Sequence, residues 1–307
     1  MTATVTLQEF LQEQRVDREL LWEVPYDGLH LWTRLWRFAV TQQQSLRRFD
    51  QSPSLAVLRP KMDKTLDTLR LALEALRLEA EGRIEAIVAE LPEWKEWARH
   101  VPGVGALSLG KLLGLVGNPA ARPLFSSLAR HCGVAVVDGK VEKPSKGQKR
   151  PYNAIAKSQL YLIVSNVLKA YPRTPNLYGE FYYLSRKKFE RKHPEWTDMH
   201  RHLASVLRTA RLFLSHLWEV CRKTQGLPVR GPYPIEYDEH AIKIPAEMAL
   251  HPFKRRDEVV AAIEKVIPLL DKEPDKEVRD EATELVRKMT ETVVGRKPQQ
   301  KPKRKCA

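Results

Sequence analysis

Residues 60–91 read PKMDKTLDTLRLALEALRLEAEGRIEAIVAEL, with no proline after the first residue and only Gly82 among good helix formers. The apolar residues are spaced by three or four, close to the heptad pattern of helices that pack side by side. This seam consists of Leu66, Leu69, Leu73, Leu76, Ala80, Ile84, Ile87 and Leu91. We predict a long, coiled-coil-like helix, whose seam packs either against a second copy, as a homodimer through residues 60–91, or against its own chain.

The rest of the chain also favours helices, so we predict a mostly α fold. The expected segments are an N-terminal helical segment (1–59), the coiled-coil-like helix (60–99), a helix-hairpin-helix domain that binds nucleic acid (100–240), a C-terminal helical pair (241–295) and a disordered basic tail (296–307). Within them we expect helices from Thr6, over 29–49, 106–116, 153–170, 176–192, 198–224, 255–270 and 275–294, and one small β-hairpin at 134–141 with Asp138-Gly139 as its turn.

Composition excludes several classes of protein. The 307 residues are 43% hydrophobic, enough for a sizeable core, and no uncharged apolar run reaches the ~18 residues of a membrane span. The first residues lack the pattern of a signal peptide. Cys132, Cys221 and Cys306 form no CxxC pair, which argues against a disulfide framework or a cysteine zinc site. We expect a cytoplasmic, nucleoid-associated protein.

The net charge of +14 is concentrated in one segment. Residues 140–230 hold 19 Lys and Arg against 6 Asp and Glu, whereas residues 1–139 hold 17 of each and residues 231–307 hold 16 against 15. A local excess of this size attracts polyphosphate by counterion release. The alternative is a soluble surface that happens to be basic. We expect nucleic acid as the partner.

The sequence VPGVG at 101–105, between two helices, indicates the hairpin of a helix-hairpin-helix motif. Glycines allow a tight turn, and the next helix presents its N-terminal amides to a phosphate. Gly103, Val104, Gly105 and Lys111 are therefore candidate phosphate contacts. An ordinary turn between two helices would have a similar sequence.

A basic loop at 143–150 contains Ser145 among cations, which are Lys143, Lys146, Lys149, Arg150 and, on the following helix, Lys157. A serine in such surroundings is a candidate nucleophile for phosphoryl transfer. Alternatively, Ser145 is a turn residue after Pro144.

Aromatic and basic residues alternate between 161 and 211, which suits unpaired bases and their backbone. The rings are those of Tyr161, Tyr171, Tyr178, Phe181, Tyr182, Tyr183 and Phe189, although Phe181 and Phe189 are more typical of a core. The candidate cations are Arg186, Lys187, Lys188, Arg201, Arg208 and Arg211, of which the last three share one helix face. His193, His200 and His202 have no i, i+4 pair among them, so we predict no metal site.

Five motifs follow the long helix in a fixed order: PGVG at 102–105, FSS at 125–127, LARHCG at 128–133, SKG at 145–147 and IAK at 155–157. This order resembles the C-terminal half of the IS-one-ten family of insertion-sequence transposases, over about residues 60–170. The resemblance implies an RNA-guided recombinase with Ser145 as its catalytic serine. It also implies an N-terminal nuclease-like domain in which four acidic residues bind Mg²⁺.

Residues 1–59 are too short and too helical for that domain, so we expect no cofactor in this chain, and Mg²⁺ only where a partner supplies the acidic site. The sequence thus favours a transposase-related protein that binds DNA, or a complex of DNA with guide-type RNA, in transposition or recombination. The alternatives are an active serine recombinase that works with a Mg²⁺-binding partner, and a structural RNA-binding protein.

Overall fold

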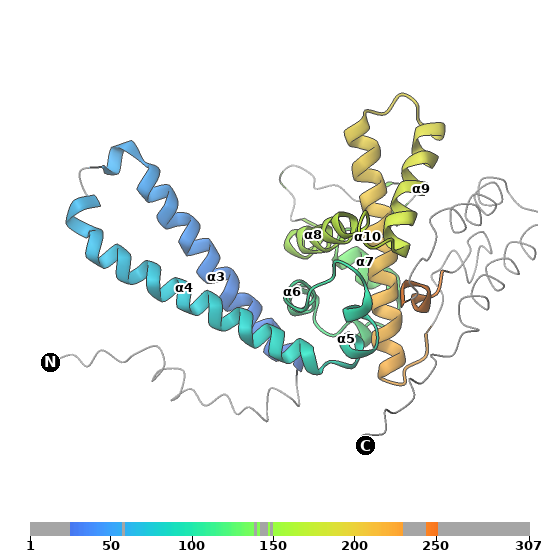
Figure 1. Cartoon of the computed structure of the whole chain (residues 1–307), viewed down its shortest axis with the longest axis horizontal. Helices are drawn as coiled ribbons and strands as arrows, with labels where there is room; N and C mark the ends of the chain where they lie inside the picture. The colour runs from blue at the N-terminus through green and yellow to red at the C-terminus, as the bar shows by residue number, and fades with distance from the viewer. Residues whose placement is uncertain are drawn as a thin grey trace, which may run out of the picture.

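The protein is mostly helical, which confirms the predicted fold class (Figure 1). The computed structural model describes residues 25–56, 59–137, 140–141, 147, 150–229 and 244–250. Its α-helices are α3 (Pro25–Gln51), α4 (Arg59–Glu90), α5 (Pro92–Glu96), α6 (Ala106–Val116), α7 (Phe125–His131), α8 (Ala154–Ala170), α9 (Leu177–Lys192) and α10 (Asp198–Thr224). Short 3-10 turns are η1 (Pro53–Leu55), η2 (Ala98–His100), η3 (Pro119–Ala121) and η4 (Ala246–Leu250).

Helices α3 and α4 lie side by side as one arm of the molecule, and α4 is the long helix predicted from residues 60–91 (Figure 1). The seam of α4 faces α3 of the same chain. Leu66, Leu73, Ala80 and Ile87, each seven residues apart, are at most 6% exposed, whereas Leu69 is 44% exposed. Helices of the same chain therefore pack on this seam, α3 along the arm and α6 at Ile84. A homodimer through residues 60–91 stays a prediction.

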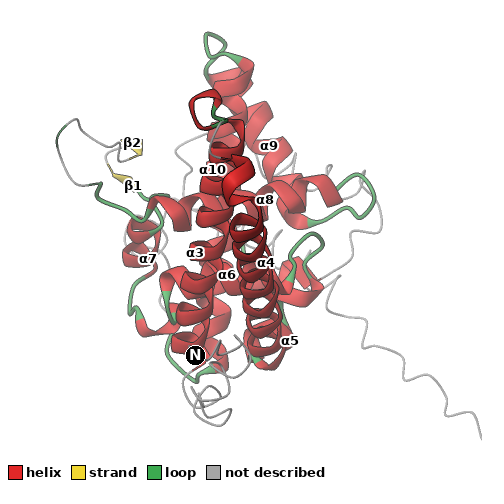
Figure 2. Ribbon diagram, turned by 90° about the vertical axis from the view of Figure 1, so that its left-hand side faces the viewer, coloured by secondary structure: helices red, strands yellow, loops and turns green. Residues whose placement is uncertain are grey.

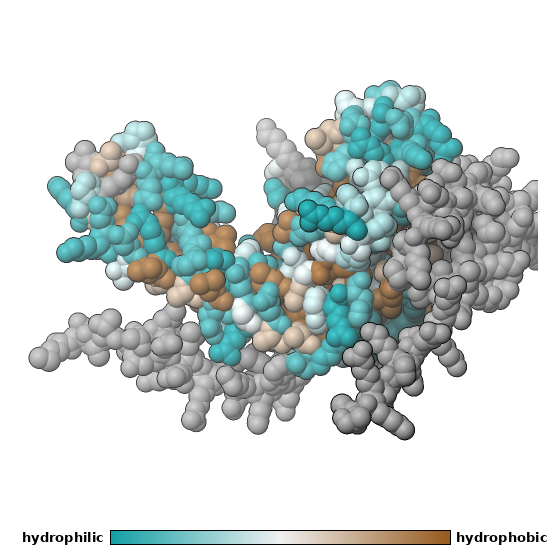
Figure 3. All heavy atoms as spheres, in the orientation of Figure 1, coloured by the Kyte–Doolittle hydropathy of each residue, from teal (hydrophilic) through white to brown (hydrophobic). Residues whose placement is uncertain are grey.

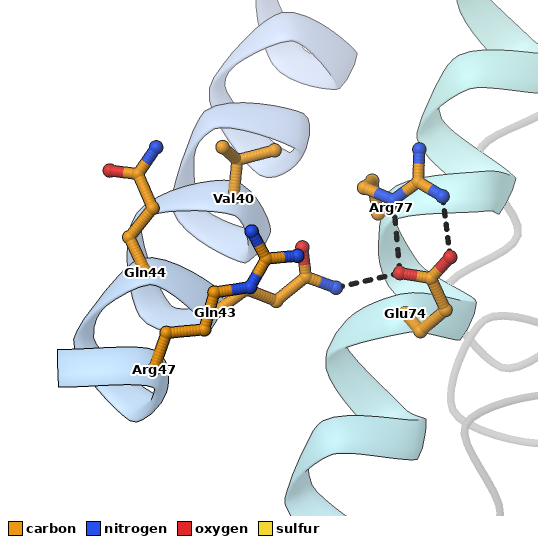
Figure 4. Close-up of a pocket in the computed structure, with 6 residues that line it drawn as sticks. All are labelled: Val40, Gln43, Gln44, Arg47, Glu74 and Arg77. Carbon is orange, nitrogen blue, oxygen red and sulfur yellow. Dashed lines mark hydrogen bonds and ion pairs between the residues drawn. The ribbon is translucent and has the colours of Figure 1, made fainter. Parts of the chain in front are cut away.

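Polar contacts flank this seam. Trp36 donates to Glu81 over 2.8 Å, and Gln43 donates to Glu74 over 2.8 Å. Arg77 binds both carboxylates, with 2.9 Å between its Nη1 and Glu81. Figure 4 shows Gln43, Glu74 and Arg77 in a polar hollow between the two helices, which is also lined by Val40, Gln44 and Arg47. The two hydrogen bonds from α3 fix the register of the hairpin, because each joins a residue of α3 to a residue of α4 at the same level. The ion pairs of Arg77 lie within α4 and hold the two accepting carboxylates in place.

Two glycines let α6 approach the arm closely. A Cβ on Gly110 would lie 2.3 Å from Cγ2 of Ile84, and one on Gly114 would lie 2.2 Å from Oγ1 of Thr33. Non-bonded atoms do not approach each other this closely, so both positions require glycine at the present spacing of the helices. This contact ties the arm to the rest of the molecule.

One hydrophobic core runs from the base of the arm to α10, across the expected segments 1–59, 60–99 and 100–240. Figure 2 shows α10 among the other helices, with α7 and the β-hairpin to one side. Trp97 donates to the carbonyl of Ala246 over 3.0 Å, and Trp218 to that of Arg122 over 2.9 Å. Figure 3 shows apolar residues near the base of both arms and mainly hydrophilic residues towards the tip of the arm that α9 and α10 form.

Local capping explains the bounds of the later helices. Asn153, Asn176 and Thr197 each accept a hydrogen bond from a backbone amide in the first turn of α8, α9 and α10, respectively. Strands β1 (Val136–Val137) and β2 (Lys140–Val141) pair antiparallel, as the predicted β-hairpin requires.

The turn residues 138–139, the predicted helices from Thr6, at 255–270 and at 275–294, and the tail at 296–307 lie outside the described residues. No helix in the described ranges is long and apolar enough to cross a membrane.

Candidate nucleic-acid interface

The hairpin at 101–105 packs against α8 through its first glycine. Gly103 has a φ of 89°, and a Cβ there would lie 2.6 Å from the backbone oxygen of Asn166. Val104 is buried, so its side chain belongs to the core and is not available to a phosphate. Gly105 is exposed, has no atom within 4 Å of an added Cβ and is the N-cap of α6. The hairpin thus offers backbone at Gly103 and Gly105, not a side chain at Val104.

Lys111 is placed in the helix interface, away from the predicted phosphate site. Its Nζ lies 3.4 Å from the ring centroid of Trp36 and 3.7 Å from Glu81. Burial lowers the pKa of Lys111 to about 8, while Glu81 opposes this shift. The expected phosphate contact is therefore corrected: Lys111 holds α6 against the arm. The cationic group is satisfied by a ring and a carboxylate of its own chain.

The basic loop is described only in part. Ser145, Lys143, Lys146 and Lys149 lie outside the described residues, so their role stays a prediction. Gly147 has a φ of 80°, and Arg150 is exposed at the end of the loop.

Lys157 lies in the first turn of α8 between two tyrosine rings. Its Nζ is 4.7 Å from the centroid of Tyr152 and 5.9 Å from that of Tyr161. The ring of Tyr152 packs on Gly133, where an added Cβ would lie 2.6 Å from it. Burial lowers the pKa of Lys157, and no described acidic residue forms an ion pair with it. The ammonium group is thus held in place by two rings, and no carboxylate in the described part of the chain neutralises it.

Arg211 is the second cation of this kind. It is half-buried on α10, and burial lowers its pKa with no opposing contribution from an acidic group. No ion pair or hydrogen bond joins its guanidinium to another described side chain. Helix α10 packs against α8, which carries Lys157.

The predicted arginines Arg186, Arg201 and Arg208 contact other residues of the arm that α9 and α10 form. Arg186 binds Asp198 and donates to the hydroxyl of Tyr182 over 3.2 Å. Arg208 lies over two rings, 5.4 Å from Phe181 and 5.7 Å from Phe189. Arg201 donates to a backbone oxygen in the turn between the helices. Lys187 is exposed and Lys188 is half-buried. The expected common track of Arg201, Arg208 and Arg211 is therefore broken up, because two of its three members are engaged within the arm.

Most of the predicted aromatic residues are structural. Tyr171 is buried and its hydroxyl donates to the carboxylate of Glu180. Tyr178 is also buried, and its hydroxyl is hydrogen-bonded to Nδ1 of His216 over 2.8 Å. Tyr182 is buried beside His202, with 2.7 Å between hydroxyl and Nδ1. Tyr183 is 42% exposed and remains near solvent. Phe181 and Phe189, expected in the core, are half-buried under Arg208.

The histidines between α9 and α10 have an arrangement that sequence reasoning missed. His193 and His200 lie on opposite faces of the Trp196 ring. His193, Trp196 and His200 are three and four residues apart in the sequence, a spacing that places side chains on one face of a helix. Because Pro194 breaks a continuous helix at this point, the spacing did not lead to a prediction of the stack. No group of His, Cys, Asp or Glu within the described ranges could hold a metal ion.

Comparison with known proteins adds no relative. No protein-family model, curated protein or solved structure matches the chain.

Proposed function

We propose that the protein is a transposase-related nucleic-acid-binding protein, whose contact surface includes the backbone of the 101–105 hairpin, the start of α8 and the flank of α10. The observation that carries the proposal is the partial burial of two cationic side chains, Lys157 and Arg211, without an ion-pair partner in the described part of the chain. Both are partly withdrawn from water, and neither has a carboxylate partner among the described residues.

Withdrawing a charge from water is costly unless an opposite charge or a set of hydrogen bonds replaces the water. The tyrosine rings beside Lys157 offset part of this cost. A phosphate would supply the missing negative charge to both residues. The composition supports this ligand, since 19 of the 52 basic residues and only 6 of the 38 acidic residues fall in 140–230.

The test is a salt titration of binding to duplex DNA, single-stranded DNA and RNA. If five phosphates are neutralised, log K should fall against log salt with a slope of about −4 or steeper. Deleting 140–230 would not be informative, because α8 and α10 contribute to the core.

The sharper variant is Lys157→Gln with Arg211→Gln, which should weaken binding and make the slope shallower by about 1 for each lost phosphate contact. Lys95→Gln is the matched control, because Lys95 is paired with Glu90 over 2.5 Å outside this surface. Binding that is insensitive to salt, or an equal loss in the control, would refute the proposal. Preference for RNA over both forms of DNA would favour the structural RNA-binding alternative.

A further inference from the structure

Three aromatic rings stack at the tip of the α9–α10 arm, and a fourth packs beside them at a tilt. The centroids of His193 and Trp196 are 4.1 Å apart with an interplanar angle of 6°, and those of Trp196 and His200 are 4.0 Å apart at 5°. Phe189 is the tilted ring, 5.4 Å from Trp196 and 6.4 Å from His193. The two imidazoles and the indole are therefore parallel and in contact, with Trp196 in the middle.

The stack ends in solvent on the side of His200. His193 and Trp196 are half-buried, whereas His200 is exposed. Among the described residues, Trp196 is the ring that contacts His200, so the other face of this imidazole has no ring against it. Figure 1 places the connection between α9 and α10 far from the core, at the end of the arm. A flat ring from another molecule would stack on this exposed face of His200.

The turn that carries the stack is held by its own contacts. Thr197 caps α10 by accepting from the amide of His200 over 3.2 Å. Arg201 donates to the carbonyl of Pro194 over 2.8 Å and lies 3.8 Å from Glu190. A platform that is ordered before binding loses little conformational entropy on binding. Arg201 therefore has a structural role, because its guanidinium holds the turn between α9 and α10.

The charge around the stack suits a polyanion. Residues 186–202 contain six Lys and Arg against three Asp and Glu, and Arg191 and Lys192 are exposed in the last turn of α9. Aromatic faces beside cations are the usual means of binding single-stranded nucleic acid, because every base presents a flat face and every nucleotide a phosphate. A duplex keeps its bases stacked internally, so it would not use the ring.

We propose that the tip of the α9–α10 arm is a stacking platform for an unpaired nucleobase, and that the exposed face of His200 receives the base. The inference rests on the proposed nucleic-acid binding and adds the form of the ligand, which is a strand with at least one unstacked base. Metal binding does not fit the same residues, because the indole of Trp196 separates the imidazoles of His193 and His200.

The experiment measures binding of the full chain to a single-stranded oligonucleotide that carries 2-aminopurine, and to the same strand with an abasic site at that position. Stacking should quench the 2-aminopurine fluorescence. His200→Ala should abolish the quenching and weaken binding of the base-containing strand about 5- to 100-fold. It should leave binding of the abasic strand within about twofold. Met199→Ala is the control, since Met199 is 64% exposed in the same turn but outside the stack.

Each outcome bears on the inference. An equal loss for both strands in His200→Ala, or the same loss in Met199→Ala, would overturn the stacking platform while leaving nucleic-acid binding in place. Absence of binding of either strand to the unmodified protein at low salt would refute the proposed function itself. Circular dichroism of both variants shows that the arm is folded. A retained fold with selective loss for the base-containing strand is the result we expect.

Discussion

The same substitution, Gly to Ala, should have opposite effects at two positions of this protein. Gly114 on α6 faces the arm, and an added Cβ would lie 2.2 Å from Oγ1 of Thr33 and 2.5 Å from the backbone oxygen of Leu29. Gly82 is exposed within α4, and an added Cβ there would meet nothing within 4 Å. Both glycines are in helices, so the intrinsic gain from alanine is shared and the difference comes from packing.

At Gly114 the helices must separate, because one of the close atoms belongs to the backbone and has no rotamer to change. Overpacking of this kind costs about 1–3 kcal/mol, and the short contacts place Gly114→Ala at the upper end, about 3 kcal/mol. For a folded body of this size, about 1 kcal/mol shifts Tm by roughly 2–4 °C, so Tm should fall by about 6–12 °C. Gly82→Ala should instead stabilise α4 by about 0.5–1 kcal/mol, which raises Tm by about 1–4 °C.

Thermal unfolding followed by far-ultraviolet circular dichroism measures both shifts under one condition. The double variant should show the sum of the two, because the sites share no contact. A neutral or stabilising Gly114→Ala would show that α6 does not lie against the arm at the spacing described. A destabilising Gly82→Ala would show that this face of α4 is covered.

Three further predictions concern the arm, a buried carboxyl group and the basic loop. Since α3 covers the seam, Leu73→Ala should cost about 2–5 kcal/mol of stability in urea unfolding, whereas Leu71→Ala, at a 72% exposed position, should be nearly neutral. If the chain forms a homodimer through residues 60–91, we expect Leu71 and Leu78, the two most exposed leucines of α4, to take part in the contact, and Leu71→Lys with Leu78→Lys should give folded monomers in light scattering. Burial raises the pKa of Glu93, whose carboxylate accepts a 2.6 Å hydrogen bond from Tyr26, so the folded state binds the proton more tightly than the unfolded state. Glu93 should therefore contribute most to stability below the ordinary pKa of Glu, and this contribution should be lost as pH rises through the raised pKa; urea unfolding across pH should show it as the difference between the unmodified protein and Glu93→Gln. Finally, Ser145→Ala should leave DNA affinity unchanged and remove no strand cleavage by the isolated chain with Mg²⁺ and copurified RNA, whereas a protein-linked strand on a denaturing gel that disappears in this variant would promote the recombinase alternative.

Features set by neighbouring residues could be predicted from the sequence. The starts of α9 and α10 follow from Asn176 and Thr197, whose side chains accept hydrogen bonds from the amides three residues later. The long helix α4 follows in the same way, because helix propensity and the spacing of apolar residues are local properties. The concentration of positive charge in 140–230 is likewise a property of composition.

Only the tertiary structure decided which residues face a ligand and which face the core. Lys111 had the position expected of a phosphate contact, yet Trp36 and Glu81, which hold it, come from two other helices. Lys157 and Arg211 have the same formal charge, but no acidic side chain of the described residues forms an ion pair with them. Charge is fixed by residue type, whereas burial and pairing depend on segments that are distant in sequence and adjacent only after folding. For the same reason, the apolar seam of α4 could be predicted from the sequence, but the packing of α3 against α4 could not.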